Sequence, residues 1–347
     1  MTETNDDGAP TGRRSSQPLL AAAAGYPALE PVHEPHLHPE LAGWRRNIGS
    51  AVALDLAPRL AQTITGLDII SWNVAVGRAD VGELMRRILD GAYDDFGTRS
   101  DRPFVMLLQE AYRAGGDVPE KPLDRRHGGS IVPGRSDILE VAELMGLSLR
   151  YAPSMRNGVH QSDRGNAILS NVALDGTHAF LLPYVRQRRV ALTTHMAGLP
   201  DLVLASAHLD TGGAPPGGWQ LRYGAGRLVQ AAELAHRLID PEHDASVVLG
   251  ADLNSPLGMR DPVVRALQDG GLQLARRVGD WRHTYHASVR LPLDYVLYRS
   301  PADRFRDVCV QRIDEVPGDR TPRVFGSDHH PLLTRVDFTA PVEPLPD

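Results

Sequence analysis

Side chains that can bind metals, move protons or hold anions recur where apolar segments of this sequence end. They are Asn73, Glu110, His208, Asp252, Asn254, Asp294, Asp328 and His329. Each of them alone is more often a turn former or a satisfied polar group. Together they favour one polar site, because ligands of α/β proteins bind at the ends of the strands of a sheet.

Residues 326–333, GSDHHPLL, are the densest of these stretches. An acid and two imidazoles stand beside Pro331, directly before an apolar run that is typical of a strand. Buried polar groups at this density cost free energy unless they are paired or take part in function. A solvated turn is the alternative for this stretch on its own, so the rest of the chain decides between the two.

Strands that alternate with helices must position these side chains. Apolar, β-rich runs predict strands at residues 67–74, 103–110, 148–152, 166–170, 189–196, 202–208 and 246–254, and in LDYVLYRS, RDVCVQRI and LLTRVDF. Helices are predicted to begin at the N-cap residues Asp80, Asp137 and Asp261, and a longer helix is predicted at residues 219–239. The alternation predicts a mixed α/β domain.

Residues 66–339 hold this pattern and are predicted to form that domain. Residues 1–39 are rich in proline, alanine, serine and charge and are expected to be irregular or disordered. Residues 40–65 carry apolar side chains at helical spacing, which predicts an N-terminal helix that Pro58 ends or bends. Residues 340–347 are expected to form a C-terminal tail.

The chain has 347 residues, a formal net charge of −6 and one cysteine, Cys309. One cysteine excludes an intrachain disulfide framework and a zinc cluster of several thiolates. The net charge argues against bulk binding of nucleic acid, although it is compatible with a nuclease that meets phosphates through a metal ion. No apolar run is long enough to predict a membrane-spanning helix. The twin arginine of GRRSSQPLLAAAAG resembles an export signal, but its apolar run is short, and a cytoplasmic location is expected.

The motifs SWNV, LLQE, RGNAILS, SAHLD, GADLN, LDYVL and GSDHHP follow one another along residues 67–338. In this order they resemble the endonuclease/exonuclease/phosphatase superfamily, which includes pancreatic-type deoxyribonuclease, abasic-site endonucleases, inositol polyphosphate 5-phosphatases and neutral sphingomyelinases. The resemblance implies a four-layer α/β/β/α sandwich, in which two mixed β-sheets lie face to face and helices cover the outside. It also implies a divalent-metal-dependent phosphoesterase.

The resemblance assigns the metal site to Glu110 and Asn73, with Asp328 as a further ligand, direct or through water. The implied cation is Mg²⁺, with Mn²⁺ or Ca²⁺ as substitutes. Carboxylate, amide and water oxygens are the ligands that such hard cations prefer.

The same resemblance implies the catalytic roles. Asp252 would be the general base or orient the attacking water, and Asn254 would help to fix the nucleophile and the phosphate. His329 would contact the scissile phosphate, with Asp294 holding the imidazole and favouring its charged form. His208 would donate to another phosphate oxygen.

Arg164, Asn166 and Arg222 are the candidate substrate-binding residues. Arg164 and Asn166 are candidates for contact with the phosphate, and core or turn roles are their alternative. Two long segments, residues 111–136 and 211–223, and the stretch YVRQRRVAL contain further arginines, with tryptophan and tyrosine nearby. Such a set suits either a nucleic-acid strand or an anionic head group. Solvated loops are the alternative for each segment.

Two enzymatic functions stay open at this point. The first is a nuclease that hydrolyses phosphodiester bonds, and the second is a phosphatase or phosphodiesterase that acts on a small molecule or a lipid head group. A binding module without activity is disfavoured, because the set of catalytic residues is complete. The basic segments favour the nuclease, with nucleic acid as the partner, and the sequence does not indicate the oligomeric state.

Overall fold

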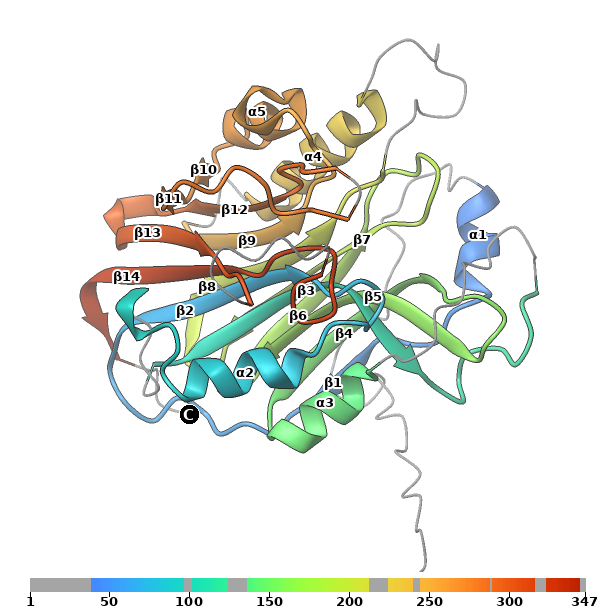
Figure 1. The fold of residues 1–347 in the computed structure, drawn as a ribbon, viewed down its shortest axis with the longest axis horizontal. Coiled ribbons are helices and arrows are strands. Elements are labelled where there is room, and N and C mark those ends of the chain that lie inside the picture. The colour runs from blue at the N-terminus through green and yellow to red at the C-terminus, as the bar shows by residue number, and fades with distance from the viewer. Residues whose placement is uncertain are drawn as a thin grey trace, which may run out of the picture.

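The computed structural model describes residues 39–96, 102–123, 136–211, 224–239, 244–287, 289–315 and 323–343. Its strands form two sheets that lie face to face (Figure 1). The larger sheet has eight strands in the order β1 (Val52–Leu54), β4 (Ser148–Arg156), β5 (Ser162–Ser170), β3 (Phe104–Ala114), β2 (Ile64–Asn73), β14 (Leu332–Val342), β13 (Phe305–Arg312) and β11 (Arg276–Val278). The smaller sheet has six strands in the order β10 (Gln273–Leu274), β12 (Asp294–Arg299), β9 (Ser246–Asp252), β8 (Leu199–His208), β7 (Val190–Met196) and β6 (Leu174–Leu181).

Helices cover the outer faces of the two sheets. The described α-helices are α1 (Pro39–Arg45), α2 (Val81–Leu89), α3 (Ile138–Met145), α4 (Ala225–Leu238) and α5 (Pro262–Asp269), and short 3-10 helices occur at Asp94–Phe96, Gly258–Arg260 and Pro301–Asp303. α2 and α3 lie on one side of the paired sheets, and α4 and α5 lie on the other (Figure 1). The predicted four-layer α/β/β/α sandwich is therefore confirmed. None of the described helices is long and apolar enough to cross a membrane.

Alternating side chains build three apolar clusters, one between the sheets and one under each helical layer. On β2, Ile70 packs under α2 and α3, whereas Ile69 faces the smaller sheet. On β9, Leu249 packs under α4 and α5, whereas Val248 faces the larger sheet. Successive side chains of a strand point to opposite faces, and here both faces are covered. The strands therefore appear in the sequence as continuous apolar runs.

The predicted N-caps are confirmed. Each of the three carboxylates accepts a hydrogen bond from the first turn of its helix: Asp80 from the backbone N of Glu83 at 2.8 Å, Asp137 from that of Leu139 at 2.8 Å and Asp261 from that of Val263 at 3.1 Å. These bonds satisfy N–H groups that have no partner within a helix. The helix predicted at residues 219–239 is observed as α4, and residues 219–223 lie outside the described part.

The N-terminal helix predicted for residues 40–65 is wrong over most of its length. α1 ends at Arg45, and Val52 pairs instead with Tyr151 of β4 at the edge of the larger sheet. Acidic side chains far away in the sequence bind the intervening backbone: the N of Gly49 donates to Asp163 Oδ2 at 2.8 Å and the N of Ser50 to Asp117 Oδ2 at 2.6 Å. These contacts hold the chain in a non-helical path that local spacing does not encode.

Several strands also differ from the prediction. β3 does not end at Glu110 but continues to Ala114, with a shift of its register against β5 between Leu108 and Ala111. The edge strand β6 is not predicted, because its side chains are mostly exposed or half-buried and its first half is largely polar. β14 extends to Val342, three residues into the predicted C-terminal tail. The predicted extension of residues 1–39 lies outside the described residues except for Pro39, where α1 begins.

Candidate active site

The register of the smaller sheet places three of the predicted catalytic residues side by side. β8 runs parallel to β9 with His208 opposite Asp252, and β12 runs antiparallel to β9 with Asp294 opposite the same Asp252. The preceding residues Ala207 and Ala251 pack outward, under α4 and α5. Because side chains alternate along a strand, His208, Asp252 and Asp294 point toward the larger sheet.

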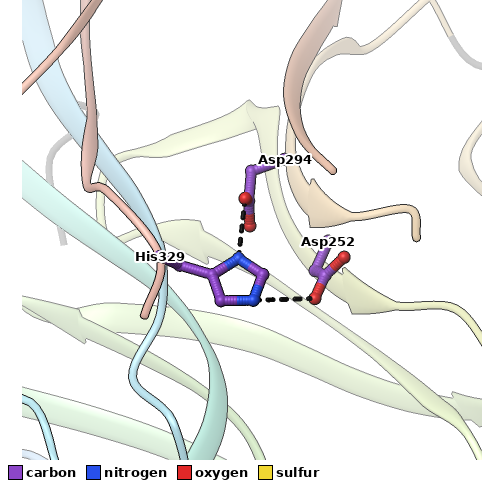
Figure 2. Close-up of side chains that lie close together, drawn as sticks. All are labelled: Asp252, Asp294 and His329. Carbon is purple, nitrogen blue, oxygen red and sulfur yellow. Dashed lines mark hydrogen bonds and ion pairs between the residues drawn. The ribbon is translucent and has the colours of Figure 1, made fainter. Parts of the chain in front are cut away.

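The larger sheet contributes His329, from the loop that enters β14. Figure 2 shows its imidazole between two carboxylates: Nδ1 lies 2.8 Å from Asp294 Oδ2, and Nε2 lies 3.9 Å from Asp252 Oδ2. All three side chains are buried, with 5% or less of each residue exposed. Among the described residues, they form the one group of three or more acidic, histidine or cysteine side chains whose ligand atoms lie within 4.8 Å of one another.

Hydrogen bonds between distant segments fix the position of His329. Trp72 Nε1 donates to the carbonyl of His329 at 2.8 Å. Ser327 Oγ donates to the carbonyl of Asn73 at 2.7 Å and accepts from the backbone N of His329 at 3.0 Å. The loop before β14 is thus tied to the end of β2, and Ser327, His329 and His330 of GSDHHP are paired rather than solvated.

Burial and charge give the two partners of the site unusual protonation equilibria. Burial disfavours the imidazolium of His329, but the carboxylate of Asp294, its hydrogen bond and the charge of Asp252 outweigh burial and raise the pKa of His329 to about 10. Burial and the negative charge of Asp294 raise the pKa of Asp252 to about 7. The site therefore combines a cationic donor with a carboxyl group that ionises near neutrality.

His208 and Asn254 complete the smaller sheet's side of the site. His208 Nε2 lies 3.4 Å from Asp252 Oδ2 and 3.1 Å from Asn254 Nδ2. Burial, reinforced by the charge of Arg189, lowers the pKa of His208 well below its usual value, so this imidazole is neutral. Asn254 has a left-handed backbone, with φ of 50°, and its N donates to Asp252 Oδ1 at 2.9 Å while its Nδ2 donates to the carbonyl of Leu209 at 3.0 Å. This sharp turn after β9 directs the side-chain amide of Asn254 toward the site.

Asn73, a predicted metal ligand, contacts the predicted base directly. Its Nδ2 donates to Asp252 Oδ2 at 2.9 Å, and its Oδ1 accepts from the N of Ala75 at 3.0 Å. Both polar atoms of its side chain thus have protein partners. In this arrangement Asn73 orients Asp252, and its oxygen can serve a cation only through its second lone pair.

Glu110 and Asp328, the other predicted metal ligands, do not belong to the close group. Glu110 is half-buried in the β3 bulge and has a left-handed backbone, with φ of 55°. Bulges are frequent next to active sites, where they re-aim a side chain. The negative charge of Glu110 acts on the pKa of Arg189, and that of half-buried Asp328 acts on the pKa of His329.

The donor set at this edge fits a divalent cation. Asp252 and Asp294 are buried carboxyl groups whose charges oppose each other, and Asp294 Oδ1 is buried without a hydrogen-bond partner. Glu110 and Asp328 add carboxylates that are not fully buried. Oxygen ligands in excess suit a hard cation such as Mg²⁺, and the positive charge would relieve the repulsion between the acids.

The predicted substrate contacts have different surroundings. Asn166 is buried, and its Nδ2 donates to the carbonyls of Val190 at 2.6 Å and Ser206 at 3.2 Å, so its amide ties the two sheets together. Arg164 is half-buried, and its charge contributes to the lowered pKa of His208, which places it near the site. Arg222 lies outside the described residues.

Two residues of the site carried no signal in the sequence. Thr284 Oγ1 accepts from the backbone N of Leu293 at 3.0 Å and from that of Asp294 at 3.0 Å, which fixes the start of β12. The ring of Tyr285 lies 5.0 Å from the ring of His329, centroid to centroid. They belong to an irregular segment that pairs only through isolated bridges, so no strand pattern marks them.

Comparisons with known proteins identify the family. The family model described as "Endonuclease/Exonuclease/phosphatase family" matches residues 70–329. No curated protein matches the sequence. Among solved structures, an endonuclease/exonuclease/phosphatase family protein from Leptotrichia buccalis is similar at 14% identity and a TM-score of 0.51, with coverage of 78% of this chain and 100% of that chain. An endonuclease/exonuclease/phosphatase from Beutenbergia cavernae is similar at 19% identity and a TM-score of 0.52, with coverage of 79% and 72%. The chain belongs to the endonuclease/exonuclease/phosphatase family.

Proposed function

We propose that this protein is a divalent-metal-dependent phosphoesterase that hydrolyses phosphodiester bonds. The cluster of Asp252, His329 and Asp294 carries this proposal, because an acceptor and a charged donor face the same small space. The 3.9 Å between His329 Nε2 and Asp252 Oδ2 is too long for a hydrogen bond. Both groups can therefore still form a hydrogen bond to a reacting oxygen atom. Membership in the family supports a phosphate ester as the molecule that reacts there.

Asp252 takes the proton of the attacking water in this proposal. A carboxyl group with a pKa of about 7 is well matched to general base catalysis near neutral pH. Asn73 Nδ2 and the backbone N of Asn254 donate to its two oxygens, Oδ2 and Oδ1, and hold the plane of the carboxylate. A base that is held in place loses little free energy in orienting itself for proton transfer.

His329 neutralises the charge that develops on the phosphate oxygens. Its imidazolium is stabilised by Asp294, so a charged N–H stands at Nε2. A preorganised donor of this kind is most effective where water is excluded. Neutral His208, held next to Asn254, supplies a second polar contact on the other side of Asp252.

Glu110 and Asp328 would hold the divalent cation in this proposal, and the side-chain oxygen of Asn73 would be a further ligand. When bound, such a cation polarises a phosphate oxygen and stabilises the leaving group. The chain's own residues then align the water and the phosphate.

We further propose that the phosphodiester belongs to a nucleic acid. Arg164 and Arg189 act electrostatically on the site residues, and Arg186 is exposed in the turn before β7. Such cations suit a substrate that carries several phosphates.

A hydrolysis panel tests both the phosphoesterase activity and the nucleic-acid substrate. Purified protein is assayed with Mg²⁺, Mn²⁺, Ca²⁺ or EDTA on single- and double-stranded DNA, RNA, bis(p-nitrophenyl) phosphate, a phosphoinositide and sphingomyelin. We expect metal-dependent cleavage of the diester and of a polynucleotide. Cleavage of the lipid or inositol esters alone would reject the nuclease assignment, and no cleavage of any ester would reject the phosphoesterase.

A further inference from the structure

Arg189 is a buried arginine at the same edge of the sheets as the site. It directly precedes β7, which is antiparallel to β8 with Ala191 opposite Ala207. Arg189 therefore lies level with the end of β8, where His208 stands. Only 4% of Arg189 is exposed.

The guanidinium of Arg189 has fewer partners than its burial demands. Nη2 donates to Gln187 Oε1 at 2.7 Å, whereas Nε is buried and has no hydrogen-bond partner. No carboxylate of the described residues forms an ion pair with it. Buried Arg113 differs in this respect, because its Nη2 lies 2.9 Å from Asp163 Oδ2. A buried guanidinium with unused donors is costly unless an anion completes it.

The turn before Arg189 is fixed from several directions. Asp210 Oδ2 accepts from the backbone N of Arg186 and of Gln187, each at 2.9 Å. Gln230 in turn accepts from the N of Asp210 at 2.8 Å through Oε1 and donates to the carbonyl of Pro183 at 2.9 Å through Nε2. The turn that presents Gln187, and through it the guanidinium, is thus held in place before any ligand arrives.

Charged residues of the active site act on Arg189. Burial lowers the pKa of Arg189 and the charge of Arg164 adds to this, whereas the carboxylates of Asp210, Glu110 and Asp252 raise it. Its own charge helps to lower the pKa of His208. The guanidinium therefore sits within the electrostatic reach of the predicted metal ligand Glu110 and of the predicted base.

We propose that Arg189 is a further substrate-binding residue, whose guanidinium binds the phosphate group of the ester beside His208. This inference rests on the proposed phosphoesterase function and adds a residue that fixes the phosphate to it. Arginine suits the role because its planar fork donates to two phosphate oxygens at once. Phosphate binding would explain both the unpaired Nε of Arg189 and the fixed turn before it.

The test compares Arg189→Met with Arg189→Lys and with Arg265→Met, a control at an exposed position of α5. Binding of inorganic phosphate is measured by calorimetry in EDTA, kcat and KM are measured on bis(p-nitrophenyl) phosphate with Mg²⁺, and thermal unfolding is followed by circular dichroism. We expect Arg189→Met to weaken phosphate binding and to lower kcat/KM at least about tenfold each, the scale of a lost hydrogen bond to a charged group. Arg189→Lys should fall between Arg189→Met and wild type, and Arg265→Met should match wild type.

The unfolding midpoint separates binding from structure. If Arg189 serves to bind an anion, its removal leaves the midpoint of thermal unfolding unchanged or raises it, because an incompletely paired buried charge disappears. A lower midpoint in Arg189→Met, or wild-type phosphate binding and turnover in that variant, would overturn the role of Arg189 while leaving the phosphoesterase in place. Conversely, a wild type that hydrolyses no ester but binds phosphate through Arg189 would reject the enzyme and retain the anion site.

Discussion

His329 Nδ1 lies 2.8 Å from Asp294 Oδ2, although the two residues come from different sheets. β12 supplies the carboxylate, and the loop before β14 supplies the imidazole. This pair joins the two sheets at their polar edge and leaves Nε2 as the free donor. The charge of the imidazole, and with it the proposed role of His329 toward a phosphate, depends on this contact.

Loss of the Asp294 carboxylate should lower the pKa of His329. In Asp294→Asn the ion pair disappears while burial stays, so the pKa of His329 should fall from about 10 toward its ordinary value. Titration of the imidazole by NMR measures this directly, and kcat should fall at least about tenfold at neutral pH. An unchanged titration would show that Asp294 does not stabilise the imidazolium.

The activity should depend on pH in a bell-shaped manner. Asp252 acts as a base only when ionised, so kcat/KM should rise as the pH approaches about 7, or at a lower pH where a bound cation lowers the pKa of the carboxyl group. His329 contributes its charge only while protonated, so kcat/KM should fall as the pH passes about 10. A profile measured with bis(p-nitrophenyl) phosphate checks both limbs. A rate that keeps rising beyond pH 10.5 would contradict the cationic role of His329.

Glu110 should control the affinity for the metal ion. Glu110→Gln keeps the size of the side chain but removes its charge, so the Mg²⁺ concentration for half-maximal activity should rise at least about tenfold. Calorimetric titration of Mg²⁺ gives an independent value. Glu143→Gln, at an exposed position of α3, serves as the control and should bind Mg²⁺ like wild type. Equal Mg²⁺ affinity in both variants would remove Glu110 from the metal site.

Thr284 should contribute to stability through its hydroxyl. Thr284→Val leaves the backbone N–H groups of Leu293 and Asp294 without their acceptor, at a fully buried position. The free energy of unfolding in urea should fall by about 1–3 kcal/mol. Thr284→Ser retains the acceptor and should lose less. Equal stability of the valine and serine variants would show that the hydroxyl does not support the start of β12.

Much of the fold could be predicted because local chemistry and global packing agree. The N-cap carboxylates of Asp80, Asp137 and Asp261 act within one helical turn, so the sequence encodes them directly. The path after α1 could not be predicted, because Asp163 and Asp117 bind the backbone of Gly49 and Ser50 across more than sixty residues of sequence. Such contacts between distant segments produce no periodic pattern in the sequence.

The site was predictable to the extent that it lies at strand ends. His208, Asp252 and Asp294 meet because register aligns the ends of β8, β9 and β12, and each residue closes or opens an apolar run. The bulge at Glu110 could not be predicted from LLQE, because the sequence does not show that the backbone of this glutamate is left-handed. Thr284 acts on backbone groups, which composition does not reveal.

Turnover of Asp252→Ala shows whether Asp252 is the general base of the proposed phosphoesterase. Single-turnover hydrolysis of bis(p-nitrophenyl) phosphate with saturating Mg²⁺ is compared between this variant and wild type, with circular dichroism to verify the fold. We expect a loss of at least about 10²-fold in rate, because the proposed general base is removed while the cation and His329 remain. A variant that is folded and hydrolyses the diester at a rate near that of wild type would contradict this role of Asp252.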